Sequence, residues 1–408
     1  RYHDVHFIPR QLAARWLIPV EMNMLNFTFQ NPTKVLFGKN TIRQLAGEIP
    51  PGARVMMVYG AQSARKYGVL DEVLLALAGF DIIEFGGIGP NPEYETLCSG
   101  IALARDKKID FLLAVGGGSV IDGTKFMAAA IPFSGEPYLL MENKGAAIRQ
   151  ALPLGAVLTL PASGSEMNNR AIISRRAANW KRAAMNDWFF PRFAVLDPTK
   201  TYTLPARQTA NGVVDTFVHV LEQYLTYPVD GKVQDRLAEG LLLLLIEEGP
   251  KALVEPENYD VRANLMWAST LGLNGLIGAG VPQDWAAHRA GYELTVLYGL
   301  DHAQTLAVLV PAMLKVRCAG KKQKLLQYGE RIWGISSGTE EDRIKAAIEK
   351  TKAFFESMGL PTRLSGCGIE KVDADRVVEL LEEHGLTAMG ERSEVSPAMM
   401  REILALCA

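Results

Sequence analysis

The sequence is poor in cysteine, in net charge and in long apolar runs. Its four cysteines are far apart and show no C-x-x-C spacing, which argues against a disulfide framework or a thiolate metal site and favours a reducing, cytoplasmic compartment. The 43 Lys and Arg residues nearly balance the 45 Asp and Glu residues, so no basic surface for nucleic acid or an anionic membrane is indicated. The longest aliphatic run, residues 241–246, is far shorter than the roughly 20 residues that cross a bilayer. We expect small molecules or a second copy of the chain as partners, but no nucleic acid and no membrane.

Two kinds of pattern follow an expected N-terminal extension at residues 1–23, which lacks the apolar core of a secretory signal and precedes natural starts at Met22 or Met24. Between 24 and 205, apolar runs alternate with helical patterns, which predicts a parallel α/β sheet. The expected strands are 33–37, 55–59, 82–85, 111–115, 154–160 and 193–196, with helices at 41–46, 70–78, 94–105 and 124–130. From 206 to 408 the spacing is helical, at 213–224, 237–245, 265–277, 305–316, 344–355 and 377–381. We expect an α/β domain, then an all-helical domain, with the boundary near Pro205.

A glycine-rich turn follows the expected strand at 111–115 and leads into a helix. It reads Gly116-Gly117-Gly118-Ser119, with Asp122 in the first turn of the helix and Ser119 as its expected cap. Glycines let the backbone approach a phosphate, and a helix start supplies N–H donors, so this junction predicts phosphate binding. A plain turn is the alternative, and the G-x-G-x-x-G pattern is absent.

A second turn, residues 159–166, follows the strand at 154–160 and carries Thr159 and Ser163. Since parallel strands end at the same edge of a sheet, these hydroxyls would face the same ligand. The alternative is that they only cap their own backbone.

Asp215 and His219 stand four residues apart in an apolar helical pattern. Side chains at i and i+4 share one helix face, so this pair offers half of the coordination sphere of a divalent metal. An ordinary hydrogen bond between the two is the alternative. His288 and His302 would complete a site of three nitrogens and one oxygen, provided that the chain turns back between them, and Gly299 is the expected place.

With these motifs, the sequence resembles the iron-containing (group III) alcohol dehydrogenases, most closely bacterial NADPH-dependent broad-range aldehyde reductases and butanol dehydrogenases. The matching stretches lie at 85–92, 114–125, 193–198, 210–219 and 274–288. The resemblance implies a dehydroquinate synthase-like fold, in which a Rossmann-like domain binds a nicotinamide cofactor and a helical domain holds one divalent metal, Zn²⁺ or Fe²⁺.

The resemblance also assigns roles to residues. The implied metal ligands are Asp215, His219, His288 and His302. The implied cofactor contacts are Gly116, Gly117, Gly118, Ser119, Asp122, Thr159, Ser163 and Lys181. The family's relay histidine is replaced by Tyr292, and Tyr298 stands where the closest relatives have another histidine, so rate and pH profile should differ. The candidate catalytic set is Tyr292, Asp215 and His302.

Cofactor choice follows from the turn after the strand at 55–59. A carboxylate there would bind the ribose of NAD and repel the 2′-phosphate of NADP. The turn contains Arg65 and Lys66 and no acid, so we expect NADP(H), with Gly60, Ser63 and Lys66 near the 2′-phosphate.

The expected reaction is hydride transfer between the nicotinamide and a metal-bound aldehyde or primary alcohol, mainly aldehyde reduction, in a homodimer. A dehydroquinate synthase-like lyase is one alternative, although the ligand-bearing segments are mainly apolar and such a lyase needs a basic pocket. A protein that binds NADPH with weakened catalysis is the other alternative.

Overall fold

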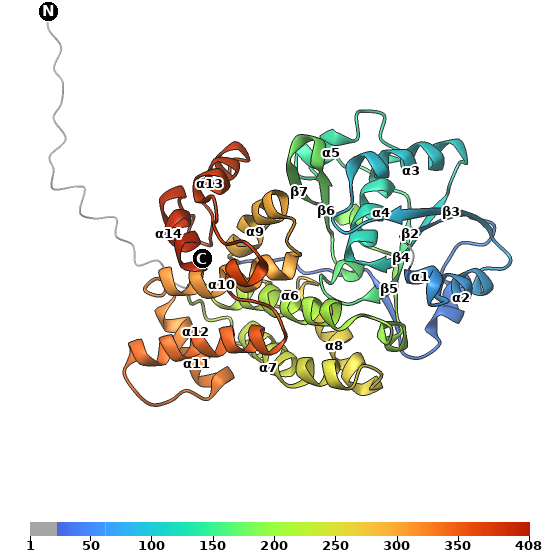
Figure 1. Ribbon diagram of the computed structural model, residues 1–408. Coiled ribbons are helices and arrows are strands. Elements are labelled where there is room, and N and C mark those ends of the chain that lie inside the picture. Colours follow the sequence, from blue (N-terminus) through green and yellow to red (C-terminus); the bar gives the residue numbers. More distant parts are fainter. Residues whose placement is uncertain (1–22, 62) are drawn as a thin grey trace, which may run out of the picture.

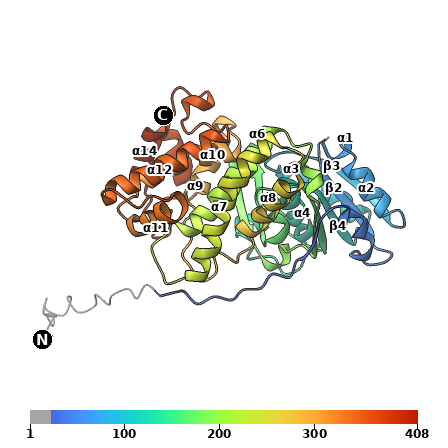
Figure 2. The same ribbon diagram turned by 90° about the horizontal axis from the view of Figure 1, so that it is seen from below.

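The computed structural model describes residues 23–61 and 63–408, so the expected extension, apart from Asn23, and Gln62 lie outside the described residues. Figures 1 and 2 show two halves, with the strands and α1–α4 gathered in one and α9–α14 in the other. Helices α6, α7 and α8 run between them.

One parallel sheet organises the first half, as predicted. Its six described strands are β1 (Lys34–Phe37), β2 (Arg54–Gly60), β3 (Asp81–Ile88), β4 (Phe111–Gly117), β5 (Leu154–Leu160) and β8 (Phe193–Leu196). They lie side by side in the order β1-β8-β5-β4-β2-β3. The central strands are apolar throughout because successive side chains enter cores on opposite faces, such as Met56 and Val55 on β2.

Helices cover both faces of this sheet. One core packs α3 (Tyr94–Asp106) and α4 (Gly118–Ala130), and the other packs α2 (Val69–Ala76) and a 3-10 helix at Thr41–Gly47, where a short helix was expected. Two short helices, α1 (Ser63–Lys66) and α5 (Tyr138–Glu142), complete this half.

The strand order reverses between β2 and β4, because β3 lies on one side of this pair and β5 and β8 lie on the other. In open parallel sheets, ligands bind outside the carboxyl ends of the strands at such a switch point. Here those ends are Gly60 and Gly117, with Leu160 at the end of neighbouring β5. The topology therefore brings together the turns that the sequence marked for cofactor binding.

An antiparallel hairpin that the sequence did not predict follows the second turn. Its strands are β6 (Arg170–Arg175) and β7 (Trp180–Met185), joined at Asn179, which has a left-handed φ of 50°. Arginine and lysine occupy many of its positions, so its hydrophobic pattern is weak. Figure 1 shows the hairpin between α4 and α9.

The second half is helical, as predicted, and within the described part of the chain no strand follows Leu196. Its helices are α6 (Ala206–Tyr224), α7 (Lys232–Val254), α8 (Tyr259–Gly272), α9 (Ala286–Tyr298), α10 (His302–Val316), α11 (Lys322–Trp333), α12 (Glu340–Ser357), α13 (Ala374–Glu383) and α14 (Pro397–Cys407). The expected helix at 265–277 is wrong beyond Gly272, because Gly275 adopts a φ of +93°. Helices α9, α11 and α14 were not among the predicted helices. Across the described residues, no helix is both long and apolar enough to cross a membrane.

Candidate metal centre and cofactor site

Helix α6 supplies the first two candidate metal ligands. Val214, Phe217 and Val218 bury one side of it, which leaves Asp215 and His219 on an adjoining face, 6% and 5% exposed. Asp215 Oδ1 and His219 Nε2 are 3.7 Å apart, too far for the ordinary hydrogen bond that was the alternative interpretation of this pair.

Helices α9 and α10 bring the other two histidines to the same carboxylate. Gly299 ends α9 with a φ of +68°, and Asp301 starts α10 with a capping box, so the chain turns back where it was expected to. The Nε2 atoms of His288 and His302 lie 3.7 and 3.6 Å from Asp215 Oδ1. Four predicted ligands from three helices therefore converge.

The donor set fits a divalent metal ion. Ligand bonds of about 2.0–2.1 Å in tetrahedral geometry separate two ligand atoms by roughly 3.4 Å, close to the 3.6–3.7 Å between Asp215 Oδ1 and the three nitrogens. Asp215 Oδ1 and His288 Nε2 are buried and have no hydrogen-bond partner among the described residues. The donor atoms of Asp215, His288 and His302 all lie within 4.8 Å of one another, so His219 is the outlying ligand.

A fifth residue, Glu222, supports this centre and was missed in the sequence. It lies on α6 three residues after His219, is 6% exposed, and accepts hydrogen bonds from the Ala287 backbone N–H at 2.7 Å and from His288 Nδ1. A carboxylate on the far nitrogen of a metal-binding histidine fixes its tautomer and orientation. The Nδ1 atoms of His219 and His302 have no such partner among the described residues.

Burial and neighbouring charges set the protonation states of the ligands. Burial lowers the pKa of His219 to about 3 and that of His302 well below its usual value. Burial also acts on His288, but the Glu222 and Asp215 carboxylates outweigh it and raise the pKa to about 9. Burial opposes ionisation of Asp215, yet the three histidines hold its pKa well below the usual range. The centre thus offers a carboxylate and two neutral imidazoles, as metal binding requires.

Tyr292 stands beside the metal centre, whereas Tyr298 does not. The Tyr292 ring lies 5.8 Å from that of His302, and burial raises the pKa of its phenol. The hydroxyl of Tyr298 instead accepts a hydrogen bond of 2.9 Å from the backbone of Asp373, where α13 begins.

The glycine turn and the second turn touch each other. A Cβ at Gly118 would lie 2.2 Å from Ser163 Oγ, and one at Gly117 would lie 3.0 Å from the Leu160 side chain. The glycines therefore leave the backbone N–H groups at the start of α4 exposed to a ligand, in a space that larger side chains would fill. Helix α4 starts at Gly118 itself, so the expected cap by Ser119 is wrong; Ser119 Oγ accepts from the Asn91 N–H at 3.3 Å. Thr159 ends up half-buried near the end of β5.

Asp122 and Lys181 hold this edge together. Asp122 is 8% exposed and lies beyond the first turn of α4. Its carboxylate accepts hydrogen bonds from the Ser165 hydroxyl and, at 3.0 Å, from the Ile172 N–H. These two bonds join α4 to the second turn and to β6. Lys181 Nζ donates to Asn91 Oδ1 at 2.8 Å, and burial lowers its pKa to about 8.

Gly60, Ser63 and Lys66 lie where β2 passes into α1. The turn offers one cation fewer than expected, because Arg65 forms an ion pair with Glu84 of adjacent β3. This leaves Lys66 as the cation available to a ligand.

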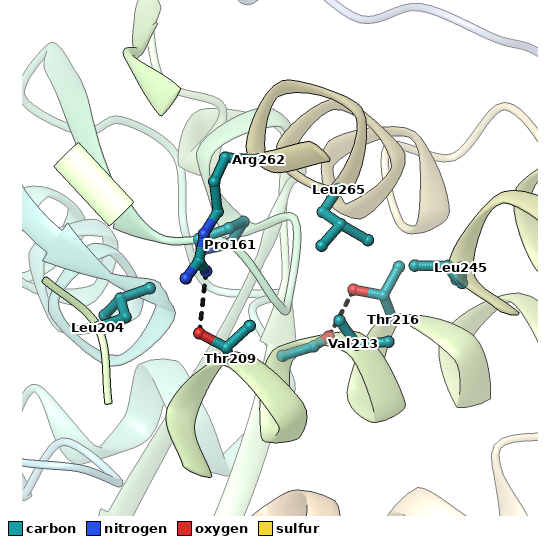
Figure 3. A pocket seen from close by; sticks show the side chains of 9 residues that line it. Pro161, Leu204, Thr209, Val213, Thr216, Leu245, Arg262 and Leu265 are labelled. Atoms are coloured by element: carbon teal, nitrogen blue, oxygen red, sulfur yellow. Dashed lines mark hydrogen bonds between the residues drawn. The ribbon is translucent and has the colours of Figure 1, made fainter. Parts of the chain in front are cut away.

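A small cavity lies beside a neighbouring face of α6 (Figure 3) and is lined by Pro161, Leu204, Thr209, Gly212, Val213, Thr216, Leu245, Arg262 and Leu265. Its volume of about 20 Å³ suits a water molecule rather than a substrate. A Cβ at Gly212 would lie 2.4 Å from Pro161 O, so α6 packs against the second turn backbone to backbone.

The chain belongs to the iron-containing alcohol dehydrogenase family. The model of the iron-containing alcohol dehydrogenases matches residues 32–198, and that of the C-terminal region of the Fe-containing alcohol dehydrogenase family matches residues 209–408.

Particular relatives are similar over nearly the whole chain. The NADPH-dependent aldehyde reductase YqhD of Escherichia coli is 56% identical over 382 residues, which cover 93% of this chain and 99% of that protein. Its crystal structure gives a TM-score of 0.94 at 54% identity, covering 95% of this chain and all of that one. The crystal structure of the NADH-dependent butanol dehydrogenase A of Thermotoga maritima gives a TM-score of 0.90 at 32% identity, covering 95% of this chain and 99% of that one.

Proposed function

We propose that this protein is a metal-dependent, NADP(H)-linked oxidoreductase that interconverts aldehydes and primary alcohols, mainly by reducing aldehydes. The observation that carries the proposal is the convergence of three histidine Nε2 atoms on Asp215 Oδ1, in a chain of the iron-containing alcohol dehydrogenase family. Family membership favours this function over a lyase of the dehydroquinate synthase type and over a protein that binds NADPH without turnover.

The proposed metal ligands are Asp215, His219, His288 and His302, which suit Fe²⁺ or Zn²⁺. When bound, the ion supplies a Lewis acid that polarises the carbonyl, and the reduced nicotinamide supplies the hydride. Glu222 accepts the hydrogen bond from His288 Nδ1, so Nε2 is the atom that would ligate the ion on giving up its own proton. Tyr292 keeps its phenolic proton, because burial raises its pKa, so it acts as a donor rather than a base.

The proposed cofactor contacts divide between two ends of the dinucleotide. The pyrophosphate and nicotinamide side is formed by Gly116, Gly117, Gly118, Ser119, Thr159, Ser163 and Lys181, with Asp122 holding their shape. Gly60, Ser63 and Lys66 face the 2′-phosphate of NADP(H). The Glu84 carboxylate of neighbouring β3 is paired with Arg65, which supports NADP(H) over NAD(H). One relative is named NADPH-dependent and another NADH-dependent, so this chain's own residues have to decide the choice.

We further propose a nucleotide-binding domain at 24–205 and a metal-binding domain at 206–408. The family models, which match 32–198 and 209–408, support this division. A homodimer and a cytoplasmic location stay predictions from the sequence, to be tested by light scattering and by cell fractionation.

The test is an assay of purified protein, loaded with Fe²⁺ or with Zn²⁺, for the loss of NADPH absorbance in the presence of butanal. We expect turnover that disappears on chelation and returns with metal. The proposal fails if no aldehyde of any chain length is reduced with either ion. Elemental analysis of protein purified without added metal then identifies the resident ion.

A further inference from the structure

The Arg170 side chain lies beside the candidate metal centre. Among the described residues it has no anionic partner. It is half-buried, and its guanidinium carbon lies 4.8 Å from the ring centroid of Trp285. Its hydrogen bonds to described residues run through its backbone, to Asn168 and Lys125, and its side chain has no ion pair with any of them. Because a partly desolvated cation is stabilised by an anion, this arrangement leaves a position for one.

Trp285 connects this cation to two metal ligands. Its ring lies 5.3 Å from the ring of His288 and 6.1 Å from that of His219. The guanidinium therefore stands within about 10 Å of the His288 ring, the bound set by the 4.8 and 5.3 Å separations. Trp285 has a left-handed φ of 61°, which is costly for a bulky side chain and is typical of residues held at functional sites.

The field around Arg170 is not balanced by carboxylates. Burial lowers its pKa, the phenol of Tyr292 raises it and Arg289 lowers it, while among the described residues no carboxylate contributes. Lys181 adds a second cation, whose ammonium nitrogen lies 4.6 Å from the centroid of the Tyr292 ring. The basic character thus comes mainly from the hairpin, with Arg289 of α9 as a further cation.

Other arginines of the same hairpin differ in this respect. Arg175 pairs with Glu95 at 2.7 Å, and Arg176 lies 3.7 Å from Glu93 with a side chain that is 85% exposed. Arg182 has no ion pair with a described residue either, but its guanidinium lies over the rings of Trp180 and Tyr138, at 5.2 and 5.5 Å. Arg170 is therefore the unpaired arginine of this hairpin that lies over Trp285, beside the candidate metal centre.

We propose that Arg170 binds the carboxylate of short aldehyde acids, so that this enzyme prefers ω-oxo carboxylates over neutral aldehydes of the same shape. The proposal rests on the aldehyde reductase function proposed above. A planar guanidinium and a carboxylate match in a bidentate pair, and a chain of four or five carbons would leave the aldehyde at the other end for the metal centre.

The reaction conserves the carboxylate. NADPH gives a hydride to the aldehyde carbon, a proton from solvent joins the oxygen, and the products are NADP⁺ and the ω-hydroxy carboxylate. For 4-oxobutanoate the product is 4-hydroxybutanoate.

The test compares 4-oxobutanoate with 4-methylpentanal, which has the same shape but no charge, on the metal-loaded enzyme. We expect kcat/KM to favour the carboxylate. In Arg170→Gln the ratio of the two kcat/KM values should fall by roughly 10- to 100-fold, as for the loss of one charge-assisted hydrogen-bonded pair. Arg170→Lys should restore part of the ratio. Arg176→Gln removes the same charge from the exposed end of the hairpin and should leave the ratio unchanged.

A binding measurement separates substrate recognition from catalysis. Without oxidised cofactor, 4-hydroxybutanoate cannot react, and its Kd follows from tryptophan fluorescence of the metal-loaded enzyme. We expect Arg170→Gln to raise this Kd about 10-fold. If Arg170→Gln reduces both aldehydes and the ratio of their kcat/KM values is unaltered, the proposal is overturned while the reductase function stands. The same holds if kcat/KM falls equally for both aldehydes because NADPH binds more weakly. If neither aldehyde is reduced, and butanal is not reduced either, the proposed function itself fails.

Discussion

Replacing Glu222 by alanine should weaken metal binding without touching a metal ligand. The carboxylate accepts from His288 Nδ1 and from the Ala287 N–H at 2.7 Å, and it is buried. Loss of a carboxylate that supports a ligating histidine costs roughly 10- to 100-fold in metal affinity, which is about 1.4 to 2.7 kcal/mol. The unpaired Ala287 N–H should cost a further 1 to 3 kcal/mol of folding stability, as an order of magnitude.

Metal affinity is measured by competition with a chromophoric chelator. Folding stability is measured as the Tm of the metal-free protein. Glu222→Gln keeps an oxygen for the Ala287 N–H and should lie between the wild type and Glu222→Ala. The control is Glu239→Gln, since Glu239 is equally buried, at 5% exposed, but lies on α7 and accepts from Tyr224 of α6 and Arg331 of α11. We expect it to lower the Tm and to keep the metal affinity. Wild-type metal affinity in Glu222→Ala would refute the reasoning.

Three further predictions concern other parts of the molecule. In Gly118→Ala the new Cβ would lie 2.2 Å from Ser163 Oγ, so the affinity for NADPH, measured by fluorescence titration, should fall at least roughly 10-fold. The control is Gly240→Ala, which has open space around its Cβ and should not change that affinity. Lys66→Gln should raise the KM for NADPH roughly 10-fold and leave that for NADH unchanged; an equal effect on both would contradict the assignment of Lys66. The Glu293 carboxylate accepts a hydrogen bond of 2.8 Å from His384 Nδ1 and raises the pKa of His384 above its usual value, so the pair stabilises the fold by about 1 kcal/mol at lower pH and loses this as pH rises through the folded pKa. The Tm difference between wild type and His384→Asn should therefore shrink from about pH 6 to about pH 9, and a constant difference would count against the pair.

Periodicity predicted the architecture because buried parallel strands are apolar along their whole length. The run at 111–115 could form little else than a central strand, and the glycines after it marked its carboxyl end. Hairpin β6–β7 escaped prediction because its arginines and lysines obscure the alternation of apolar and polar residues. The chain reverses at Asn179, which has a left-handed φ, but neither of the residues beside it is the glycine or proline that usually marks a turn.

The convergence of the four candidate metal ligands could be predicted because histidines are rare in this chain and because Asp215 and His219 share a helix face. The same spacing rule offered Glu222, one turn further, but a glutamate on a helix is usually read as a solvated side chain. Arg170 could not be found in this way. Its contact with Trp285 joins residues more than one hundred positions apart, and no local pattern records it.

The contact between Gly212 and Pro161 O has a consequence for evolution. Two backbones, not side chains, set the spacing between the helix that carries Asp215 and the second turn, for which we propose cofactor contacts. Thr216 holds them together with a hydrogen bond of 3.0 Å to Ala162 O. Residues around the substrate can therefore change without altering the register in which hydride donor and metal centre meet. Substrate range is free to diversify in such a chain while the chemistry is inherited unchanged.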